Sequence, residues 1–336
     1  MKKLFALILA GIMCLSLVAC GGNDAPAEEP AEDTATEETT DPAAETYNVG
    51  ICQLVQHVAL DAATQGFIDA LNEALPGQVE FSNQNASNDI PMCSTIVNQF
   101  VSEEVDLILA NATPALQAAS AATIDIPILG TSITEYGVAL EIADFSGTVG
   151  GNISGTSDLA PLDQQAAMLN EWFPDAKNVG LIYCSAEANS QYQVDVVKAE
   201  LEALGYTATL YSFSDSNDLA AVTESAVAAS DVIYVPTDNT VAANTGIIDN
   251  ICQPAGIPVI AGEEGVCAGC GVATLSISYY DLGVATGKMA AKILTGEADI
   301  STMPIEYAPA TPKYNPVICE ELGLTAPEGY VAIEIG

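Results

Sequence analysis

The sequence alternates between short apolar runs and amphipathic stretches over most of its length. Residues Tyr47–Val55 form an apolar run typical of a buried strand, and Ala59–Leu75 then places Phe67 and Leu71 on one stripe at helical spacing. This pair of patterns recurs as far as Leu294. A chain that alternates strands and helices forms parallel sheets covered by helices on both faces. The pattern therefore predicts an α/β fold.

The predicted elements can be given by their residue ranges. Strands are predicted over residues 47–55, 79–81, 105–110, 126–129, 178–183, 207–211, 231–235, 257–261 and 272–277. Helices are predicted over residues 59–75, 90–101, 114–122, 161–173, 188–204, 219–228, 240–252 and 280–294.

The alternation restarts near residues 150–160, after a glycine-rich stretch that contains Gly147, Gly150, Gly151 and Gly155. The second half then repeats the element order of the first at similar length. We therefore predict two doubly wound parallel-sheet lobes. In such lobes the loops that follow the strands face a common cleft, where ligands bind.

Charge excludes several classes of function. The 336 residues contain 7 Lys+Arg against 45 Asp+Glu, for a formal net charge of −38, and all seven cations are lysines. Binding to nucleic acid is not expected, because neutralising phosphates requires a basic surface. An arginine clamp on a ligand carboxylate is impossible. His57 is the sole histidine, so no histidine-rich metal site, and no metal or cofactor, is predicted.

The N-terminal residues are typical of a bacterial lipoprotein signal peptide. Basic Met1–Lys3 precedes an apolar run, Leu4–Val18, that is short for a membrane span of about 20 residues. Residues Leu17–Gly21 resemble a lipobox, which predicts a signal peptide over 1–19 and a lipidated, palmitate-bearing Cys20. An uncleaved anchor helix is the alternative. Residues 22–46 carry nine acids and no cation, which favours an extended linker over 20–46.

The cysteines leave several possibilities open. Seven remain after Cys20, an odd number, so at least one is unpaired. The pair Cys267 and Cys270 forms a lone CxxC without the second pair of a zinc ribbon. A local disulfide or buried thiols are the main interpretation, and redox or metal chemistry is the alternative.

Polar residues follow most of the predicted strands, where helices begin. Such residues often cap helices, and helix N-termini also bind anions. With no arginine available, Thr113 and the N–H groups of the helix that follows it are a candidate binding site for a ligand carboxylate. A ligand ammonium could be bound by acids in these loops, and together the two sites would suit a zwitterion. The candidate acids are Asp158, Glu187, Asp238, Glu263 and Glu264.

These loops carry a family resemblance over about Tyr47–Pro327. The segments that match are 54–61, 65–67, 106–108, 112–115, 154–158, 187–190, 236–239, 262–264 and 279–288, followed by Pro304. They resemble the substrate-binding lipoproteins of a family of ABC importers, whose members with assigned ligands bind aromatic amino acids, notably tryptophan. The resemblance implies a type I periplasmic-binding-protein-like fold. It also implies a three-segment hinge near Ser154–Pro161, Ser276–Asp281 and Pro304–Pro309.

The resemblance implies lobes over 47–155 with 278–306 and over 156–277 with 307–336. It also implies a set of ligand-binding residues. They are Gln53, His57, Thr113, Ser132, Ser157, Asp158, Glu187, Asn189, Ser190, Asp238, Asn239 and Glu264. Two positions depart from the family pattern, since Val58 replaces a usual proline and Thr134-Glu135-Tyr136 replaces a Thr-Asp-Pro-like segment. Both lie in first-lobe loops, so they affect the identity of the ligand.

Aromatic residues carry a further expectation. Trp172 and the pair Tyr279–Tyr280 are expected to pack within the fold, the pair at the hinge. Tyr136 and Tyr183 lie near strand ends and are the candidates to face an aromatic ligand.

The function predicted from these features is that of an extracytoplasmic receptor rather than an enzyme. A lipid at Cys20 would tether it to the cell membrane, and a monomer would deliver its amino acid to an ABC permease and its ATPase. The chain has no Gly-x-Ser-x-Gly elbow, and Gly287-Lys288-Met289 lacks the hydroxyl of a Walker motif. A sensor or adhesin without transport, and a secreted hydrolase using Glu263 and Glu264, are the alternatives.

Overall fold

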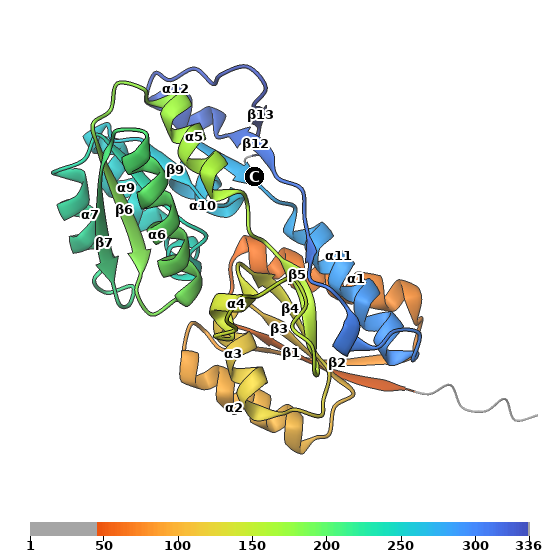
Figure 1. Ribbon diagram of the computed structural model, residues 1–336. Helices are drawn as coiled ribbons and strands as arrows, with labels where there is room; N and C mark the ends of the chain where they lie inside the picture. Colours follow the sequence, from red (N-terminus) through yellow and green to blue (C-terminus); the bar gives the residue numbers. More distant parts are fainter. Residues whose placement is uncertain (1–45, 335–336) are drawn as a thin grey trace, which may run out of the picture. The chain divides into compact units, whose positions relative to one another are not determined.

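Two sheets divide the strands of the chain between them. The computed structural model describes residues 46–334, and the predicted signal peptide, Cys20 and linker lie outside these residues except for Thr46 (Figure 1). The first sheet has the order β11-β5-β4-β3-β1-β2, and all its strands run parallel. Its strands are β1 (Tyr47–Gln53), β2 (Val79–Asn85), β3 (Leu107–Asn111), β4 (Ile128–Ile133), β5 (Ile153–Ser157) and β11 (Glu306–Tyr307).

The second sheet has the order β13-β12-β10-β9-β8-β6-β7. Its strands are β6 (Asn178–Cys184), β7 (Thr207–Phe213), β8 (Val232–Val235), β9 (Val259–Ala261), β10 (Ala273–Ser276), β12 (Thr311–Tyr314) and β13 (Val331–Ala332). The predicted fold class is confirmed, with one departure from parallel pairing. β12 runs antiparallel to β10, with Ser276 opposite Thr311, because the chain leaves the end of β10 for the first sheet and comes back to the second sheet at that same end.

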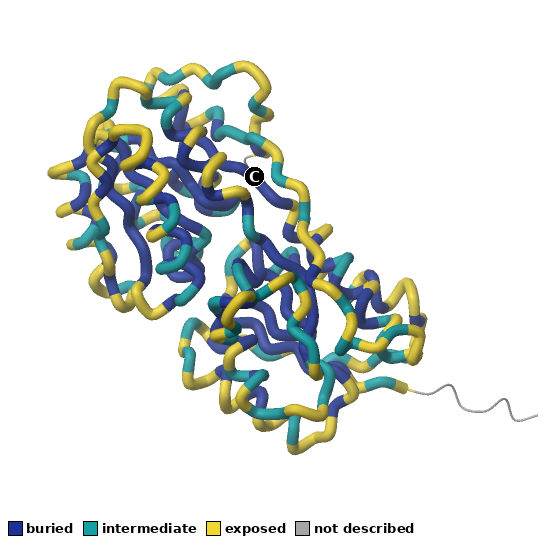
Figure 2. The backbone as a smooth tube through the Cα atoms, viewed as in Figure 1, coloured by how far each residue is buried: buried dark blue, intermediate teal, exposed yellow. Residues whose placement is uncertain are grey.

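Helices cover both faces of the first sheet, as the alternating pattern requires. These helices are α1 (Val58–Ala74), α2 (Ile90–Ser102), α3 (Thr113–Ala122), α4 (Tyr136–Ala139) and α11 (Tyr279–Leu294), followed by the 3-10 helix η1 (Ile300–Thr302). Apolar residues of α2 and α3 pack on one face, around Cys52 and Ile108. Residues of α1 and α11 pack on the other, around Ile51 and Leu109. Figure 2 shows the strands as a buried layer between partly exposed helices.

The second sheet is covered in the same way. Its helices are α5 (Leu162–Trp172), α6 (Ala188–Ala203), α7 (Leu219–Val227), α8 (Asn239–Ala242), α9 (Thr245–Ala255), α10 (Glu264–Cys270) and α12 (Pro316–Glu321). Residues of α5, α6 and α12 pack on one face, and those of α7, α9 and α10 on the other. The single helix predicted over 240–252 is therefore wrong in detail, because two helices, α8 and α9, replace it. A break at Ala243–Asn244 separates them.

The chain passes between the two sheets three times. It leaves the first sheet after β5 and enters α5 through residues 158–161, which we name the first crossing. It returns between β10 and α11 through residues 277–278, the second crossing. It leaves again between β11 and β12 through residues 308–310, the third crossing. β5 extends to Ser157 within the first sheet, two residues beyond the predicted end of that lobe's first segment.

Helices α1 and α11 lie side by side and pack closely because small residues face each other (Figure 1). A methyl group on Gly283 would collide with the backbone of Ala63, and one on Gly66 with the backbone of Tyr280. Neither collision can be relieved by a side-chain rotation. These glycines thus permit the approach of the two helices that joins the second crossing to the first lobe.

We expect Gly283→Ala to lower the free energy of unfolding by about 1–3 kcal/mol, the cost of overpacking a well-packed core. Urea unfolding monitored by circular dichroism measures this. Gly246→Ala is the control, because Gly246 lies in α9 with open space around it and no positive φ. Equal effects at the two positions would contradict this account of the helix pair.

Candidate functional site

A small cavity lies where residues of both lobes and of the first crossing meet. Its volume is about 10 Å³, close to the space of a single water molecule. Its lining residues are His57, Leu60, Ser132, Thr134, Asp158, Asn189, Thr237, Asp238, Asn239, Ala242, Glu263 and Tyr279. Most of them follow the carboxyl ends of strands, which is where doubly wound folds bind ligands. We name this set the cleft residues.

His57 and Ser132 form the first-lobe wall. His57 is the N-cap residue of α1, and its Nε2 lies 3.3 Å from Oδ1 of Asn239 across the cleft. Burial lowers the pKa of this imidazole. Ser132 lies where the register between β4 and β5 shifts, and its φ of 56° is the left-handed conformation that non-glycine residues rarely adopt. That strained conformation fixes the serine at the cleft.

Asp158 and Tyr279 lie at two different crossings. Asp158 is the first residue of the first crossing, and Tyr279 follows the second. The Tyr279 hydroxyl donates a hydrogen bond to Oδ2 of Asp158 at 2.9 Å. Burial raises the pKa of the Asp158 carboxyl, and it also raises that of the Tyr279 hydroxyl. The other carboxylate oxygen of Asp158, Oδ1, is buried and has no hydrogen-bond partner among the described residues.

The second-lobe wall is organised around the N-terminus of α8. Both carboxylate oxygens of Glu187 accept hydrogen bonds from this turn, from the backbone and side chains of Asn239 and Thr240 at 2.7–3.0 Å. Asp238 accepts from the backbone N–H groups of Cys184 and Val241 at 2.7 and 2.9 Å. Burial, followed by the nearby charge of Glu187, raises the pKa of Asp238 to about 7. Two acids thus satisfy the free N–H groups of one short helix.

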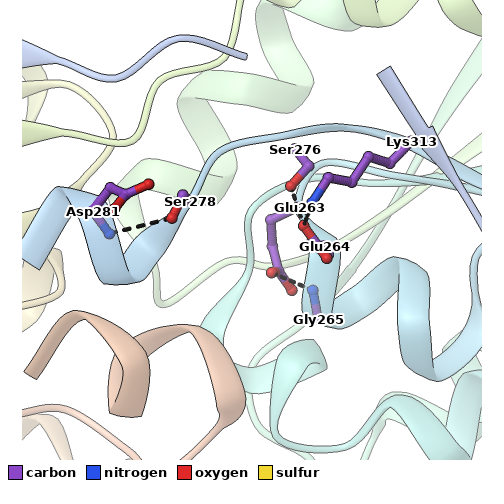
Figure 3. Close-up of polar contacts among 7 residues, drawn as sticks. All are labelled: Glu263, Glu264, Gly265, Ser276, Ser278, Asp281 and Lys313. Carbon is purple, nitrogen blue, oxygen red and sulfur yellow. Dashed lines mark hydrogen bonds and ion pairs between the residues drawn. The ribbon is translucent and has the colours of Figure 1, made fainter. Parts of the chain in front are cut away.

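Two adjacent glutamates have different roles (Figure 3). Glu263 lines the cavity and caps α10, since its carboxylate accepts from the N–H groups of Gly265 and Val266, and burial raises its pKa to about 7. Glu264 instead accepts hydrogen bonds from Lys313 Nζ at 2.7 Å and from the Ser276 hydroxyl. The two carboxylates therefore do not form a pair at one site.

Half of the predicted site residues border the cavity. These are His57, Ser132, Asp158, Asn189, Asp238 and Asn239. The remaining six do not line it, and they are Gln53, Thr113, Ser157, Glu187, Ser190 and Glu264. Most of these have structural partners. Gln53 bonds Asp61 and Thr64, and the Ser157 hydroxyl donates to the carbonyl of Thr134.

Six of the cleft residues are absent from the ligand-binding set that the resemblance implies, although Glu263 was predicted as a candidate partner of a ligand ammonium. Leu60, Thr134, Thr237, Ala242, Glu263 and Tyr279 line the cavity in addition to the predicted set. Thr237 and Glu263 sit in loops that carried the family resemblance, so adjacency to predicted residues could have indicated them. Leu60 lies in the matching segment 54–61 but is an apolar helix residue typical of a core position, and Ala242, also apolar, lies in none of the matching segments.

The two tyrosines predicted to face an aromatic ligand, Tyr136 and Tyr183, do not border the cavity. Tyr136 is buried in the first lobe, stacks on Phe145 and donates its hydroxyl to the carbonyl of Thr156. Neither Tyr136 nor Tyr183 lines the cavity, where Tyr279 and the imidazole of His57 are the ring-bearing residues. Trp172 packs edge-on against Tyr330 with the ring centroids 5.3 Å apart, so its predicted packing role is confirmed.

The cysteines form no cross-link in the part of the chain that the structure describes. All seven after Cys20 are buried free thiols, which favours the buried-thiol interpretation. The thiols of Cys267 and Cys270 donate to carbonyls of Gly271 and Val266. Residues 46–334 contain no group of three or more His, Cys, Asp or Glu side chains that could hold a metal ion.

Comparison with known proteins agrees with this geometry. Residues 48–333 match the family model described as ABC transporter substrate binding protein. The tyrosine-binding protein of Clostridioides difficile (strain R20291) is 35% identical over 301 residues, covering 88% of this chain and 85% of that protein.

Solved structures extend the comparison. A crystal structure from Streptococcus pneumonia in complex with L-Trp is 31% identical, has a TM-score of 0.81, and covers 86% of this chain and 100% of that one. The ligand-free, open structure of a substrate-binding protein with adhesive properties from Clostridium difficile is 37% identical with a TM-score of 0.66, covering 87% and 100%. The chain therefore belongs to the family of ABC transporter substrate-binding proteins.

Proposed function

We propose that this protein captures an amino acid between its two lobes on the outer side of the cell membrane and delivers it to an ABC permease. The observation that carries the proposal is a set of buried polar atoms at the cavity. Six side-chain atoms of the described residues are buried without a hydrogen-bond partner, and three of them, Ser132 Oγ, Asp158 Oδ1 and Asn189 Oδ1, belong to cleft residues. Such atoms are costly unless something satisfies them.

The chemistry of these atoms favours an ammonium group. Two of the three are acceptors, and the residues that carry them are at most 6% exposed. Of the five acids considered for this role, Glu187, Asp238 and Glu263 already accept hydrogen bonds with both oxygens, and Glu264 pairs with Lys313. Asp158 retains a free oxygen in the cleft, so it is the proposed partner of the ligand ammonium.

The ligand carboxylate requires donors. The first turn of α1 borders the cavity through His57 and Leu60, and no side chain caps it. Its free N–H groups, with the Ser132 hydroxyl, are the proposed seat of the carboxylate. The predicted seat at Thr113 is less suitable, because Thr113 does not line the cavity.

Binding requires the lobes to separate and close. The cavity of about 10 Å³ is far too small for an amino acid. The two sides of the cleft are joined by contacts that can break, namely His57 to Asn239 and Asn88 Nδ2 to Thr240 Oγ1 at 3.1 Å. We propose that the three crossings are the hinge, and that a ligand that touches both walls favours the closed state.

The relatives support an aromatic amino acid as the ligand. One is named a tyrosine-binding protein, and another was crystallised with L-Trp. Tyr279, His57 and the polar lining of the cleft would suit tyrosine, whose hydroxyl also needs a hydrogen-bond partner.

Localisation and anchoring rest on the N-terminal sequence. We propose that residues 1–19 are a signal peptide, that Cys20 carries the lipid, and that the protein acts as a monomer. In residues 46–334 no helix has the length and apolar character needed to cross a membrane. A role in adhesion is a second candidate, because one relative is described as a substrate-binding protein with adhesive properties.

A thermal-shift screen of the purified protein tests the proposed ligand. Tyrosine, tryptophan or phenylalanine at 100 times its dissociation constant is expected to stabilise the native state by about 2.7 kcal/mol. The matched deaminated acids, which keep the ring and carboxylate but lack the ammonium, should give no comparable shift. Stabilisation by a sugar, or equal stabilisation by the deaminated acids, would contradict an amino acid receptor of this design.

A further inference from the structure

Glu264 connects two strands that lead into the hinge. Its Oε2 accepts from Lys313 Nζ at 2.7 Å and from the hydroxyl of Ser276 (Figure 3). The side chains of Glu264 and Lys313 are about one-third exposed, at 32% and 29%. We name these three residues the hinge brace. None of them lines the cavity.

The partners of Glu264 lie beside different crossings. Ser276 is the last residue of β10, directly before the second crossing. Lys313 lies in β12, three residues after the third crossing, and pairs with Thr274 across the antiparallel ladder. The brace therefore fixes the end of β10 and the strand β12, which lie next to the second and third crossings, relative to each other and to the first turn of α10.

The same region touches the cleft on two sides. Glu263, the neighbour of Glu264, lines the cavity and caps α10. Tyr279 follows Ser276 by three residues and donates to Asp158 at the start of the first crossing. Two sets of side-chain contacts thus involve residues in or beside the three crossings, Glu264 with Ser276 and Lys313, and Tyr279 with Asp158, and Glu263 is adjacent to the first set.

The ion pair is unusual for this protein. Among the described residues two Lys–Glu pairs occur, and the other, Lys198 with Glu202, lies within one turn of α6 on the surface. Lys313 and Glu264 instead connect different elements 49 residues apart. In a chain with so few cations, a lysine beside the acidic cleft also balances a carboxylate that would otherwise repel Glu263.

We propose that Glu264 and Lys313 are positioning residues that hold the hinge strands in register and thereby set ligand affinity without touching the ligand. This inference rests on the proposed function, in which the crossings act as a hinge. A pre-positioned hinge reduces the conformational entropy lost on closure, which strengthens binding. Partial exposure weakens the pair, so its effect is moderate.

The test measures dissociation constants by calorimetry, with tyrosine or tryptophan as the probe, for the whole protein and its variants. Lys313→Met and Glu264→Gln are each expected to raise the dissociation constant about 2- to 5-fold, the upper part of the range for partly exposed ion pairs. The double variant should be no weaker than the single ones, because both lose the same interaction. Lys313→Arg should restore most of the affinity. Lys198→Met, which breaks the surface pair on α6, is the matched control and should leave it unchanged.

Hydrogen exchange of the ligand-free protein supplies a readout that does not depend on the ligand. Amides of residues 276–282 and 308–314 should exchange faster in Lys313→Met than in the wild type, and Lys198→Met should not change them. Unchanged exchange in these segments overturns the brace, whatever the affinity data show. If no amino acid binds the wild type, the proposed ligand class fails, and the exchange result alone decides on the brace.

Two affinity results would also overturn the inference. One is an unchanged dissociation constant in both single variants with a lower melting temperature, which shows a structural role alone. The other is loss of binding in Glu264→Gln but not in Lys313→Met, which places Glu264 at the ligand.

Discussion

Asp158→Asn is expected to weaken binding of the amino acid ligand by about 2–5 kcal/mol, or roughly 30-fold to several thousand-fold, the cost of removing one partner of a buried charge pair. Asp158 has a free carboxylate oxygen at the cavity, whereas Glu187, Asp238 and Glu263 use both of theirs. An asparagine keeps the size and can still accept from Tyr279. It loses the charge and turns a donor toward the ammonium.

The fold should tolerate this change. A buried carboxyl whose pKa is raised by burial is costly in the ligand-free protein, so the amide should leave its melting temperature unchanged or higher. Asp163→Asn removes the same charge from an exposed position in the first turn of α5 and is the control. Calorimetry measures the affinity of each variant. Binding by Asp158→Asn at wild-type strength would mean that the ammonium lies elsewhere.

The ligand-free protein is expected to lose stability as the pH rises from about 4 to 7. Burial raises the pKa of Asp158, and it raises the pKa values of Asp238 and Glu263 to about 7. In the unfolded chain these carboxyls titrate near pH 4. Between pH 4 and 7 the folded state therefore binds more protons than the unfolded state, so the unfolding free energy falls as the pH rises, by an amount on the order of a few kcal/mol.

Other titratable groups change the unfolding free energy in the opposite direction or in a different pH range. The lowered pKa of His57 gives stability that is lost as the pH falls through 6.5. As the pH rises from 5 to 6.5, this imidazole therefore offsets part of the decrease in unfolding free energy that the three carboxyls cause. Asp231 and Asp299 have lowered pKa values and act below about pH 4. Urea unfolding at pH 5, 6.5 and 8 measures the trend. The variant Asp238→Asn with Glu263→Gln should flatten it, and an equal slope in wild type and variant would disprove the assignment.

Ligand affinity should change with pH in the opposite direction. An ammonium pairs with Asp158 only when the carboxyl is ionised, so the dissociation constant should fall as the pH rises through the raised pKa of Asp158. The same protein would thus become less stable without ligand and bind more tightly with it.

The periodic elements of the fold were predictable, and the short polar ones were not. β1 lies in a short apolar run and α1 shows an apolar period of 3.6 residues, so their existence follows from the sequence. β5 has the sequence ISGTS and is fully buried, but its small polar residues are typical of a loop. α10 has seven residues, two of them glycine, and β12 contains a proline. Tertiary contacts form these elements, and a single sequence does not contain that information.

The site residues that directly follow strands were predictable from their position in the chain. Residues such as Asp158 and Asp238 follow strands, and strand ends meet at one edge of a parallel sheet. The orientation of neighbouring side chains was not predictable. Glu263 turns into the cleft because it caps α10, and this directs Glu264 to Lys313, a residue 49 positions away. Leu60 enters the lining through the angle at which α1 meets the second lobe.

A crystal structure of the protein with bound tyrosine or tryptophan would show directly which residues hold the two ends of the ligand. We expect the ligand amine within hydrogen-bond distance, about 2.7–3.2 Å, of Asp158 Oδ1, and the ligand in contact with residues of both lobes. The ligand carboxylate should face the first turn of α1. A ligand bound to one lobe only, or an amine held by Glu264 with Asp158 still unpartnered, would contradict this expectation.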